Sequence, residues 1–338
     1  MKAELHVDVL EPSEFAAWDR LVASSSQGSP YAMATYLAAL SEATGATFRV
    51  VAARRGDDLI GGVALFEQTR ADGRHVAPRP LLYYTGCVLK DFGTRYPSEQ
   101  TARTLEVTAA LGAFVAACGF RAVTLKHRST FVDARAFMAD GWTVRPGYTY
   151  VVPIANLEEA WQRVEQNLRR LIKRCTQDGL VITDDADVET FLRLHHETTT
   201  RKGLPAYLPA DRFAVFIERL RQAGLCRLYH ARLPDGTGVS TQLVLMGCGP
   251  VAHTVCAATA PEHLRSGATA FLRWKVFESL NSLGFEANDL TDAALNSVSH
   301  FKSQLGGTLE LLLICERTAK PSGLGARMRA SLAALRER

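Results

Sequence analysis

The feature of this 338-residue sequence that most limits its possible folds is an internal repeat of one α/β unit. Residues 119–125 read Gly-Phe-Arg-Ala-Val-Thr-Leu, and residues 284–290 read Gly-Phe-Glu-Ala-Asn-Asp-Leu. In each copy a long helical run precedes the glycine and a strand-like run follows the aromatic residue. Glycine is favoured just beyond the C-terminus of a helix, so both segments predict a helix, a glycine stop and a strand. Two copies are too few for a solenoid.

The length and the position of the turn residues predict two domains. Domains typically have about 100–200 residues. Pro146, Gly147 and Pro153 interrupt the chain near residues 146–156, which places the expected domains at residues 1–150 and 151–338. Helical periodicity recurs in the second half, with helices expected over residues 157–177, 188–200, 212–222 and 267–282. Strands are expected over residues 225–233, 239–246 and 251–257, between the last two of these helices, so the class is α/β.

Composition excludes several classes of protein. The net charge is only +4, which argues against DNA binding by the whole surface. Seven cysteines without a CxxC pair indicate reduced, buried thiols in a cytoplasmic protein. No run approaches the ~18 apolar residues of a membrane span, and the N-terminus lacks the apolar region of a signal peptide. P-loop, HExxH and GxSxG motifs are absent, which argues against NTPases, zinc hydrolases and serine esterases, and no metal site is expected.

Adjacent histidines at positions 195 and 196 resemble metal ligands only superficially. Neighbouring residues on a helix point about 100° apart, so they do not share a face as i, i+4 ligands do. A surface helix is the preferred interpretation of His195-His196-Glu197.

The expected helix over residues 157–177 is strongly basic on one side. An apolar stripe from Leu157 to Cys175 occupies the other side. The basic side carries Arg163, Arg169, Arg170, Lys173 and Arg174. Such a face can bind a polyanion such as a pyrophosphate or a tRNA backbone, through Arg170, Lys173 and Arg174 above all. The alternative is a solvated face whose carboxylate partners lie elsewhere in the fold.

Two further segments are candidates for the site. The turn before the helix at 267–282 contains Arg265 and Gly267, and a helix N-terminus of small residues can hold an anion. In acyl-CoA-dependent N-acetyltransferases this turn has the form Q/R-x-x-G-x-G/A, which the present sequence matches only in part. The second segment is Phe301-Lys302 with Gly306-Gly307. Lys302 can neutralise a carboxylate, a phosphate or a developing oxyanion, or can be a surface lysine on a short helix.

The ordered set of these segments resembles the FemABX-like family of aminoacyl and acyl transferases. The segments are residues 167–174, Thr200-Arg201-Lys202-Gly203, residues 271–275, Gly284-Phe285 to Asp289-Leu290, and Phe301-Lys302-x-x-Leu305-Gly306-Gly307. The resemblance covers the whole chain and is strongest over residues 157–310. It implies two tandem GNAT-like domains, each a twisted mixed β-sheet flanked by helices, with most of the site in the second domain.

The resemblance also implies a function and roles for individual residues. Its well-known members transfer an aminoacyl group from aminoacyl-tRNA to an amine of a nucleotide-linked cell-wall precursor. By position, Lys302 matches the family's lysine beside the reacting groups, and Arg170 or Arg174 matches a phosphate-binding arginine. Members often have a tyrosine where this chain has His253, so an exopolysaccharide or natural-product precursor is an open alternative as the acceptor.

The expected mechanism needs neither a cofactor nor a covalent intermediate, because holding the donor and the amine together is sufficient. Asp289, His253 or a substrate carboxylate would accept the proton, Lys302 would stabilise the oxyanion or hold the acceptor, and Phe301 would contact substrate. Two alternatives remain. One is an acyl-CoA-dependent N-acyltransferase, and the other is a non-catalytic binding protein that kept the fold. The sequence does not indicate the oligomeric state.

Overall fold

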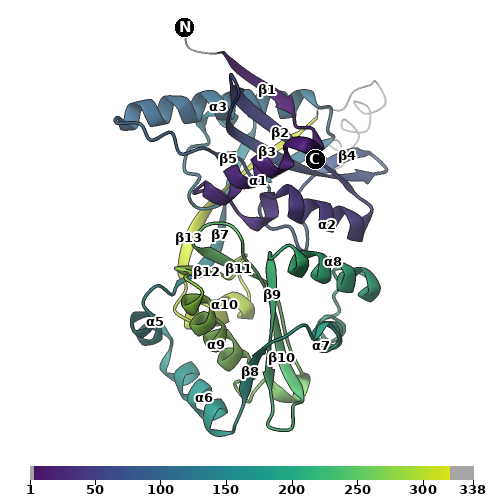
Figure 1. Ribbon diagram of the computed structural model, residues 1–338, viewed down its shortest axis with the longest axis vertical. Helices are drawn as coiled ribbons and strands as arrows, with labels where there is room; N and C mark the ends of the chain where they lie inside the picture. The colour runs from purple at the N-terminus through teal and green to yellow at the C-terminus, as the bar shows by residue number, and fades with distance from the viewer. Residues whose placement is uncertain (1–3, 320–338) are drawn as a thin grey trace, which may run out of the picture.

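The first half of the chain folds into six strands and four α-helices, as the computed structural model of residues 4–319 shows (Figure 1). In chain order its elements are β1 (Leu5–Val9), η1 (Pro12–Glu14), α1 (Phe15–Ser24), η2 (Pro30–Ala32), α2 (Ala34–Thr44), β2 (Thr47–Arg55), β3 (Asp58–Arg70), β4 (Gly73–Val76), β5 (Val88–Leu89), α3 (Pro97–Ala117), β6 (Ala122–Lys126) and α4 (Arg135–Ala139).

The strand β7 (Thr143–Pro153) leads into the second half, in which the same order of elements recurs. The following elements are α5 (Leu157–Arg163), α6 (Gln166–Gln177), β8 (Val181–Asp184), α7 (Val188–Arg201), α8 (Ala210–Gln222), β9 (Cys226–Arg232), β10 (Gly238–Leu245), β11 (Val251–Thr259), η3 (Pro261–His263), α9 (Ala268–Ser282), β12 (Ala287–Asp289), α10 (Ser297–Gln304) and β13 (Thr308–Thr318). No helix among these described residues is both long and apolar enough to cross a membrane.

The repeat expected from the sequence is confirmed in three dimensions. Gly119 follows α3 with φ of 71°, and Gly284 follows α9 with φ of 87°, the left-handed conformation that glycine adopts most readily. β6 then pairs in parallel with β4, and β12 pairs in parallel with β11. The helix, the glycine stop and the parallel strand therefore occupy equivalent places in both halves, and the fold is α/β with mixed sheets.

A single sheet runs through the whole molecule because two strands are exchanged between the halves. The strand order is β1-β2-β3-β4-β6-β13-β7-β12-β11-β10-β9-β8, and β5 pairs with β3. Thus β13, the last strand described, reaches back to pair with β6 of the first half. In turn β7, which follows β6 in sequence, pairs with β12 of the second half. The expected boundary near residues 146–156 lies largely within β7, and the two domain ranges stay a prediction.

Helices cover both faces of the second-half sheet. One core joins α7 and α8 with α1 and α2 of the first half, and includes Trp18, Tyr36, Phe213 and Phe216. Another core packs α5, α6 and α9 against the opposite face, and includes Phe271 and Phe277. In Figure 1, α2 and α8 face each other between the halves, and Arg219 pairs with Glu42 there at 3.1 Å. The first core therefore ties the two halves together.

The expected helix over residues 157–177 is wrong as one continuous element. α5 ends at Arg163, and Val164 has the extended ψ of 131° before α6 begins. The N–H of Glu165 donates to the carbonyl of Gln304 at the end of α10 at 2.9 Å. Gly306 fits tightly against Arg163, since a Cβ on Gly306 would lie 2.9 Å from the Cβ of Arg163. The helix breaks because its backbone is recruited by α10, a long-range contact that periodicity does not report.

Candidate functional site

The second-half sheet has an open edge where β12 ends early. β12 pairs with β11 only from Val251 to His253, whereas β11 continues to Thr259. The chain leaves β12 through Thr291 and Asp292, whose φ angles of 49° and 57° are in the left-handed region. This conformation is uncommon for residues other than glycine, so neighbouring contacts must hold it. The last six residues of β11 therefore face a gap instead of a strand.

Two adjoining cavities occupy this gap. The inner cavity has a volume of about 160 Å³, and the outer cavity has about 440 Å³. Both are bounded by α7, β11, α9 and α10, and the outer one also reaches the first turn of α9 at Thr269. Five residues line both cavities, which shows that they meet: Thr198, Lys202, Ala257, Arg273 and Val298. We call the two together the β11 groove.

The charge of the β11 groove is one-sided. Its cationic lining residues are Arg201, Lys202, Arg273 and Lys302. No Asp or Glu of the described residues lines either cavity. Cations around a common space repel one another and favour an anion between them. The groove is therefore suited to a substrate that carries negative charge.

Lys302 lies in the inner cavity as a buried amine with a lowered pKa. Its Nζ donates hydrogen bonds to the carbonyl of Thr291 and, at 2.7 Å, to that of Asp292. Burial, and then the charge of Arg273, lowers the pKa of Lys302 to about 8. Lys302 thus holds the left-handed turn after β12 and places its ammonium group beside the groove. The sequence prediction of a site lysine agrees with this position, although its role stays a prediction.

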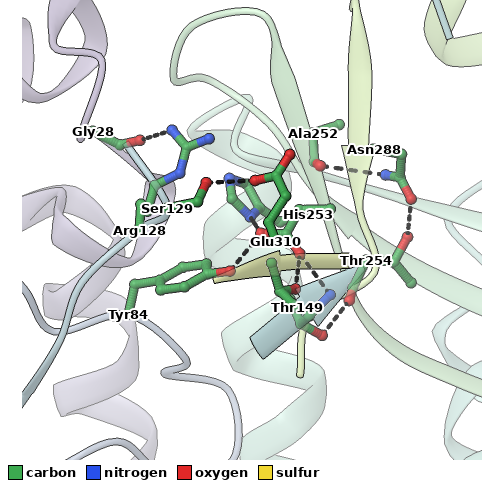
Figure 2. Close-up of polar contacts among 12 residues, drawn as sticks. Gly28, Tyr84, Arg128, Ser129, Thr149, Ala252, His253, Thr254, Asn288 and Glu310 are labelled. Atoms are coloured by element: carbon green, nitrogen blue, oxygen red, sulfur yellow. Dashed lines mark hydrogen bonds and ion pairs between the residues drawn. The ribbon is translucent and has the colours of Figure 1, made fainter. Parts of the chain in front are cut away.

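Asp289 and His253 lie together, but in a buried cluster that lines neither cavity of the groove. Asp289 accepts hydrogen bonds from the hydroxyls of Tyr84 and Thr149, both at 2.6 Å, and from the N–H of Thr291 at 2.8 Å. Nδ1 of His253 lies 3.4 Å from its carboxylate. Figure 2 shows that this cluster joins side chains from both halves.

The electrostatics of this cluster fix its ionisation. Burial alone would raise the pKa of Asp289, but the hydrogen bonds and charge of His253, together with the Thr149 and Tyr84 hydroxyls, hold it below its usual range. Burial lowers the pKa of His253. Asp289 is therefore a carboxylate whose oxygens are already occupied, and only 2% of it is exposed.

Arg273 is the residue of the groove that sequence reasoning missed as a candidate. It is 8% exposed and makes no hydrogen bond or ion pair with any described residue, and its Nε and Nη1 are buried without a partner. The available signal was a lone arginine within the apolar run Phe271-Leu272-Arg273-Trp274, on a helix that is buried on most sides. Such a helix has no solvent face to accommodate a charge, which points to a functional reason.

Of the remaining predicted binding residues, only Phe301 lines the groove. Arg170, Lys173 and Arg174 are exposed on α6, and Arg174 lies 3.5 Å from Asp178. Gly267 packs against α6, since a Cβ there would lie 2.7 Å from the Cβ of Leu171. Arg265, two residues earlier in the same turn, is exposed, whereas Phe301 lines the outer cavity.

His195 corrects the expectation of a surface helix. His196 is exposed, but His195 is 6% exposed and lines the inner cavity. Its ring packs 4.9 Å from the ring of Tyr207, centroid to centroid. Burial, and then the charge of His196, lowers its pKa to about 4. Packing of α7 against α8 therefore turns one of the two histidines inward. No group of three or more potential metal ligands occurs among residues 4–319.

Comparison with known proteins supports a GNAT fold for this chain. Residues 162–303 match the family model described as an acetyltransferase (GNAT) domain. The comparison with curated proteins finds no match. Among solved structures, FemX superposes with a TM-score of 0.68 at 14% identity, covering 91% of this chain and 96% of FemX.

Other solved structures share the arrangement over the full chain. The L-PGS from Bacillus licheniformis gives a TM-score of 0.61 at 10% identity, with 96% of this chain and 98% of that chain covered. A tandem GNAT protein from the clavulanic acid biosynthesis pathway gives 0.55 at 13% identity, with 95% and 100% covered. The chain therefore shares the tandem GNAT fold of these solved structures, and residues 162–303 in its second half match an acetyltransferase (GNAT) domain.

Proposed function

We propose that the protein is an N-acyltransferase that moves an aminoacyl group from aminoacyl-tRNA to an amine of a cell-envelope, exopolysaccharide or natural-product precursor. The observation that carries this proposal is the β11 groove, which combines an open strand edge with four cations and no lining carboxylate. A GNAT-fold groove of this charge suits transfer between two substrates that carry anionic groups. The groove also favours an enzyme over a binding protein, because it holds an amine with a pKa near 8.

The position of α6 supports tRNA as the carrier of the donor. The Sγ of Cys175 on α6 contacts the carbonyl of Ser266 at 3.4 Å, in the turn that leads to the outer cavity. α6 therefore packs against the turn that leads to the outer cavity, and its exposed cations could bind tRNA phosphates while an acylated 3′ end enters the groove. One similar structure carries the name lysylphosphatidylglycerol synthetase, and lysyl is an aminoacyl group.

Acyl-CoA is the second candidate donor, because α9 begins beside the outer cavity and Thr269 in its first turn lines that cavity. The preceding turn argues against it. The N–H groups of His263, Leu264 and Ser266 already donate to carbonyls within the turn, at 3.0, 3.4 and 3.3 Å. Fewer N–H groups are then left for a pyrophosphate than a helix N-terminus can offer.

In the proposed reaction the acceptor amine attacks the acyl carbonyl. The bond from carbonyl carbon to amine nitrogen forms, and the ester bond to the tRNA hydroxyl breaks. Neutral Lys302 accepts the proton of the amine, and the departing oxygen takes a proton back. A neutral amine at Lys302 can donate two hydrogens to the carbonyls of Thr291 and Asp292 and direct its lone pair into the cavity.

Asp289 and His253 then act as positioning residues for Lys302. Asp289 accepts the N–H of Thr291, and the carbonyl of Thr291 accepts from Nζ of Lys302. The buried carboxylate therefore fixes the turn that orients the lysine. In this assignment Lys302 accepts the proton, and Asp289 and His253 keep Lys302 in position. The buried carboxylate of Asp289 does not need to reach the substrate.

Filter binding with bulk aminoacyl-tRNA at several salt concentrations tests the donor. The double variant Arg170→Glu/Lys173→Glu should bind more weakly than the native protein. The slope of log K against log salt should fall in magnitude by about 1.4–1.8, since each phosphate contact contributes about 0.7–0.9. The matched control is Arg20→Glu/Arg70→Glu, which reverses two exposed arginines of the first half and should leave binding unchanged.

Thermal unfolding with CoA and acetyl-CoA separates the two donors. Stabilisation by aminoacyl-tRNA but not by CoA supports the proposal. Stabilisation by CoA alone, with no tRNA binding at low salt, would make acyl-CoA the donor and overturn the choice of tRNA.

A further inference from the structure

Arg273 is a buried cation that has no counter-charge among residues 4–319. The groups that face it are Lys302 on α10, Cys256 on β11, Lys202 after α7, and His195 on α7. Burial raises the pKa of Cys256, so its thiol stays neutral and cannot balance the charge. The charges of Arg273 and Lys302 oppose each other, which is one cause of the lowered pKa of Lys302.

This arrangement is unfavourable unless an anion enters the inner cavity. Removing a charge from water costs several kcal/mol, and burying two like charges together adds repulsion. Structural arginines elsewhere in the chain avoid this cost. Arg232, for example, is bonded to Asp185 at 2.9 Å and to Asp187 at 2.8 Å. The absence of any such partner among the residues described around Arg273 therefore points to a ligand, not to a structural role.

The inner cavity limits the size and type of that ligand. Its volume of about 160 Å³ is much smaller than that of the outer cavity, about 440 Å³, so the inner cavity itself suits a small group at the end of a substrate. Thr198 is 8% exposed, and its Oγ1 is also buried without a hydrogen-bond partner. A planar guanidinium with unpartnered N–H groups beside a hydroxyl matches the geometry of a carboxylate.

We infer that the inner cavity is a carboxylate-binding subsite in which Arg273 and Thr198 hold a carboxylate of the amine acceptor. This inference rests on the proposed N-acyltransferase function and names its acceptor class, an amino acid or a peptide with a free carboxylate. The acceptor side is favoured because Tyr83 of the first half lines the inner cavity, whereas the outer cavity is lined by Leu264 and Thr269 at the start of α9, the turn where the donor would bind.

The subsite would also favour the reactive form of the amine. An acceptor whose carboxylate is held by Arg273 places its amino group near Lys302, within the same small cavity. A second ammonium beside two cations is disfavoured, so the amine is bound most easily after losing its proton. The carboxylate therefore anchors the acceptor, and the surrounding charge helps to prepare its nucleophile.

Thermal unfolding with the dipeptide alanyl-alanine and with its C-terminal amide tests the subsite. The free acid should raise Tm by about 2–4 °C at saturation, and the amide should not. In Arg273→Met the free acid should lose its effect, while the Tm of the ligand-free variant should stay equal or rise. Arg232→Met is the control, since it breaks bonds to two carboxylates and should lower Tm. A lower Tm for ligand-free Arg273→Met, or equal stabilisation by acid and amide, would overturn the inference.

Two further measurements distinguish a failure of the carboxylate subsite from a failure of the proposed donor. Arg273→Met should bind bulk tRNA like the native protein, so loss of acid binding alone assigns the subsite separately from the donor. Arg273→Lys should restore part of the acid-dependent shift, because it keeps the charge but not the planar fork. Tighter binding of aspartyl-tRNA than of asparaginyl-tRNA, abolished in Arg273→Met, would place the carboxylate on the transferred group and overturn the acceptor assignment.

Discussion

The two copies of the repeated unit differ at the place where one strand of the parallel pair extends past the other. In the first half, the chain between β4 and α3 covers β6, since the N–H of Thr85 donates to the carbonyl of Lys126 at 3.0 Å and its hydroxyl accepts from the N–H of Lys126. In the second half β11 extends past β12, and the edge opens into the β11 groove. In the first half this strand edge is covered by the chain itself, and in the second half it stays open to a ligand.

Charge follows the same division. A cavity of about 460 Å³ in the first half is lined by Lys90, Asp91 and Asp133, and Lys90 pairs with Asp58 at 2.8 Å. In the β11 groove, the charged residues among the described lining residues are all cations. Charges that are satisfied within the fold need no ligand, whereas unbalanced buried charges do. The comparison therefore assigns chemistry to the second half and architecture to the first.

The largest expected effect is on kcat, and it distinguishes two lysines with lowered pKa values, one in each half. Lys302→Met should lower kcat by about 10²–10⁴-fold, because it removes the proton acceptor. Lys126→Met is the comparison, since burial lowers the pKa of Lys126 as well, but its Nζ lies 4.0 Å from the carboxylate of Asp292 and its side chain lines neither cavity of the β11 groove. Single-turnover aminoacyl transfer measures both. Equal losses would contradict the division of labour between the halves.

The pH dependence of kcat sharpens this assignment. Neutral Lys302 is the active form, so kcat should rise with pH up to about 8 and then level off. Arg273→Met removes a like charge, which should raise the pKa of Lys302 and move the rising limb to higher pH. The measurement is kcat of the native protein and of Arg273→Met from pH 6 to 10 at saturating acceptor. If the rising limb of the kcat profile lies at the same pH in both proteins, Arg273 does not act on Lys302.

Asp289→Asn tests the contact between the halves. The amide would lose charge-assisted hydrogen bonds from Tyr84, Thr149 and Thr291, so the free energy of unfolding should fall by about 1.5–3 kcal/mol. Urea unfolding measures the loss. A large fall in kcat at unchanged stability would instead make Asp289 the proton acceptor.

Gly86→Ala tests the covered edge of the first half. A Cβ at Gly86 would lie 2.6–2.7 Å from atoms of His127, so crowding should lower the free energy of unfolding by about 1–3 kcal/mol. Because Gly86 lines neither cavity of the β11 groove, tRNA binding by the folded fraction should not change. Loss of tRNA binding without loss of stability would show that the first-half edge also serves the donor.

The smallest effect concerns the cap of α10. Asn296 accepts the N–H of Ser299 at 3.0 Å, so Asn296→Ala should cost about 0.5–2 kcal/mol. Fraying of α10 should also lower kcat modestly, because Lys302 lies on this helix. α3, the long helix of the first half, has no side-chain cap at Tyr96, so Tyr96→Ala is a control that should cost less. Equal costs would contradict the role of the cap.

Local patterns predicted a large part of the fold correctly. The helices around residues 188–200, 212–222 and 267–282, and the glycine stops at 119 and 284, are present as α7, α8, α9 and two left-handed turns. Predictions beyond local range were less complete. The break at Val164 depends on α10, and β13 was not predicted, although its alternating start and apolar centre are typical of a strand.

The sequence by itself determined the repeated unit, the class of fold and the basic face of α6, because periodicity and glycine conformation act over a few residues. Only the tertiary structure decided which edge stays open, that β7 and β13 are exchanged, and that Arg273 and Lys302 share one cavity without a carboxylate. These features depend on contacts between distant segments and on burial. The physical meaning of a charged residue is set by the partners around it, and a linear sequence does not specify those partners.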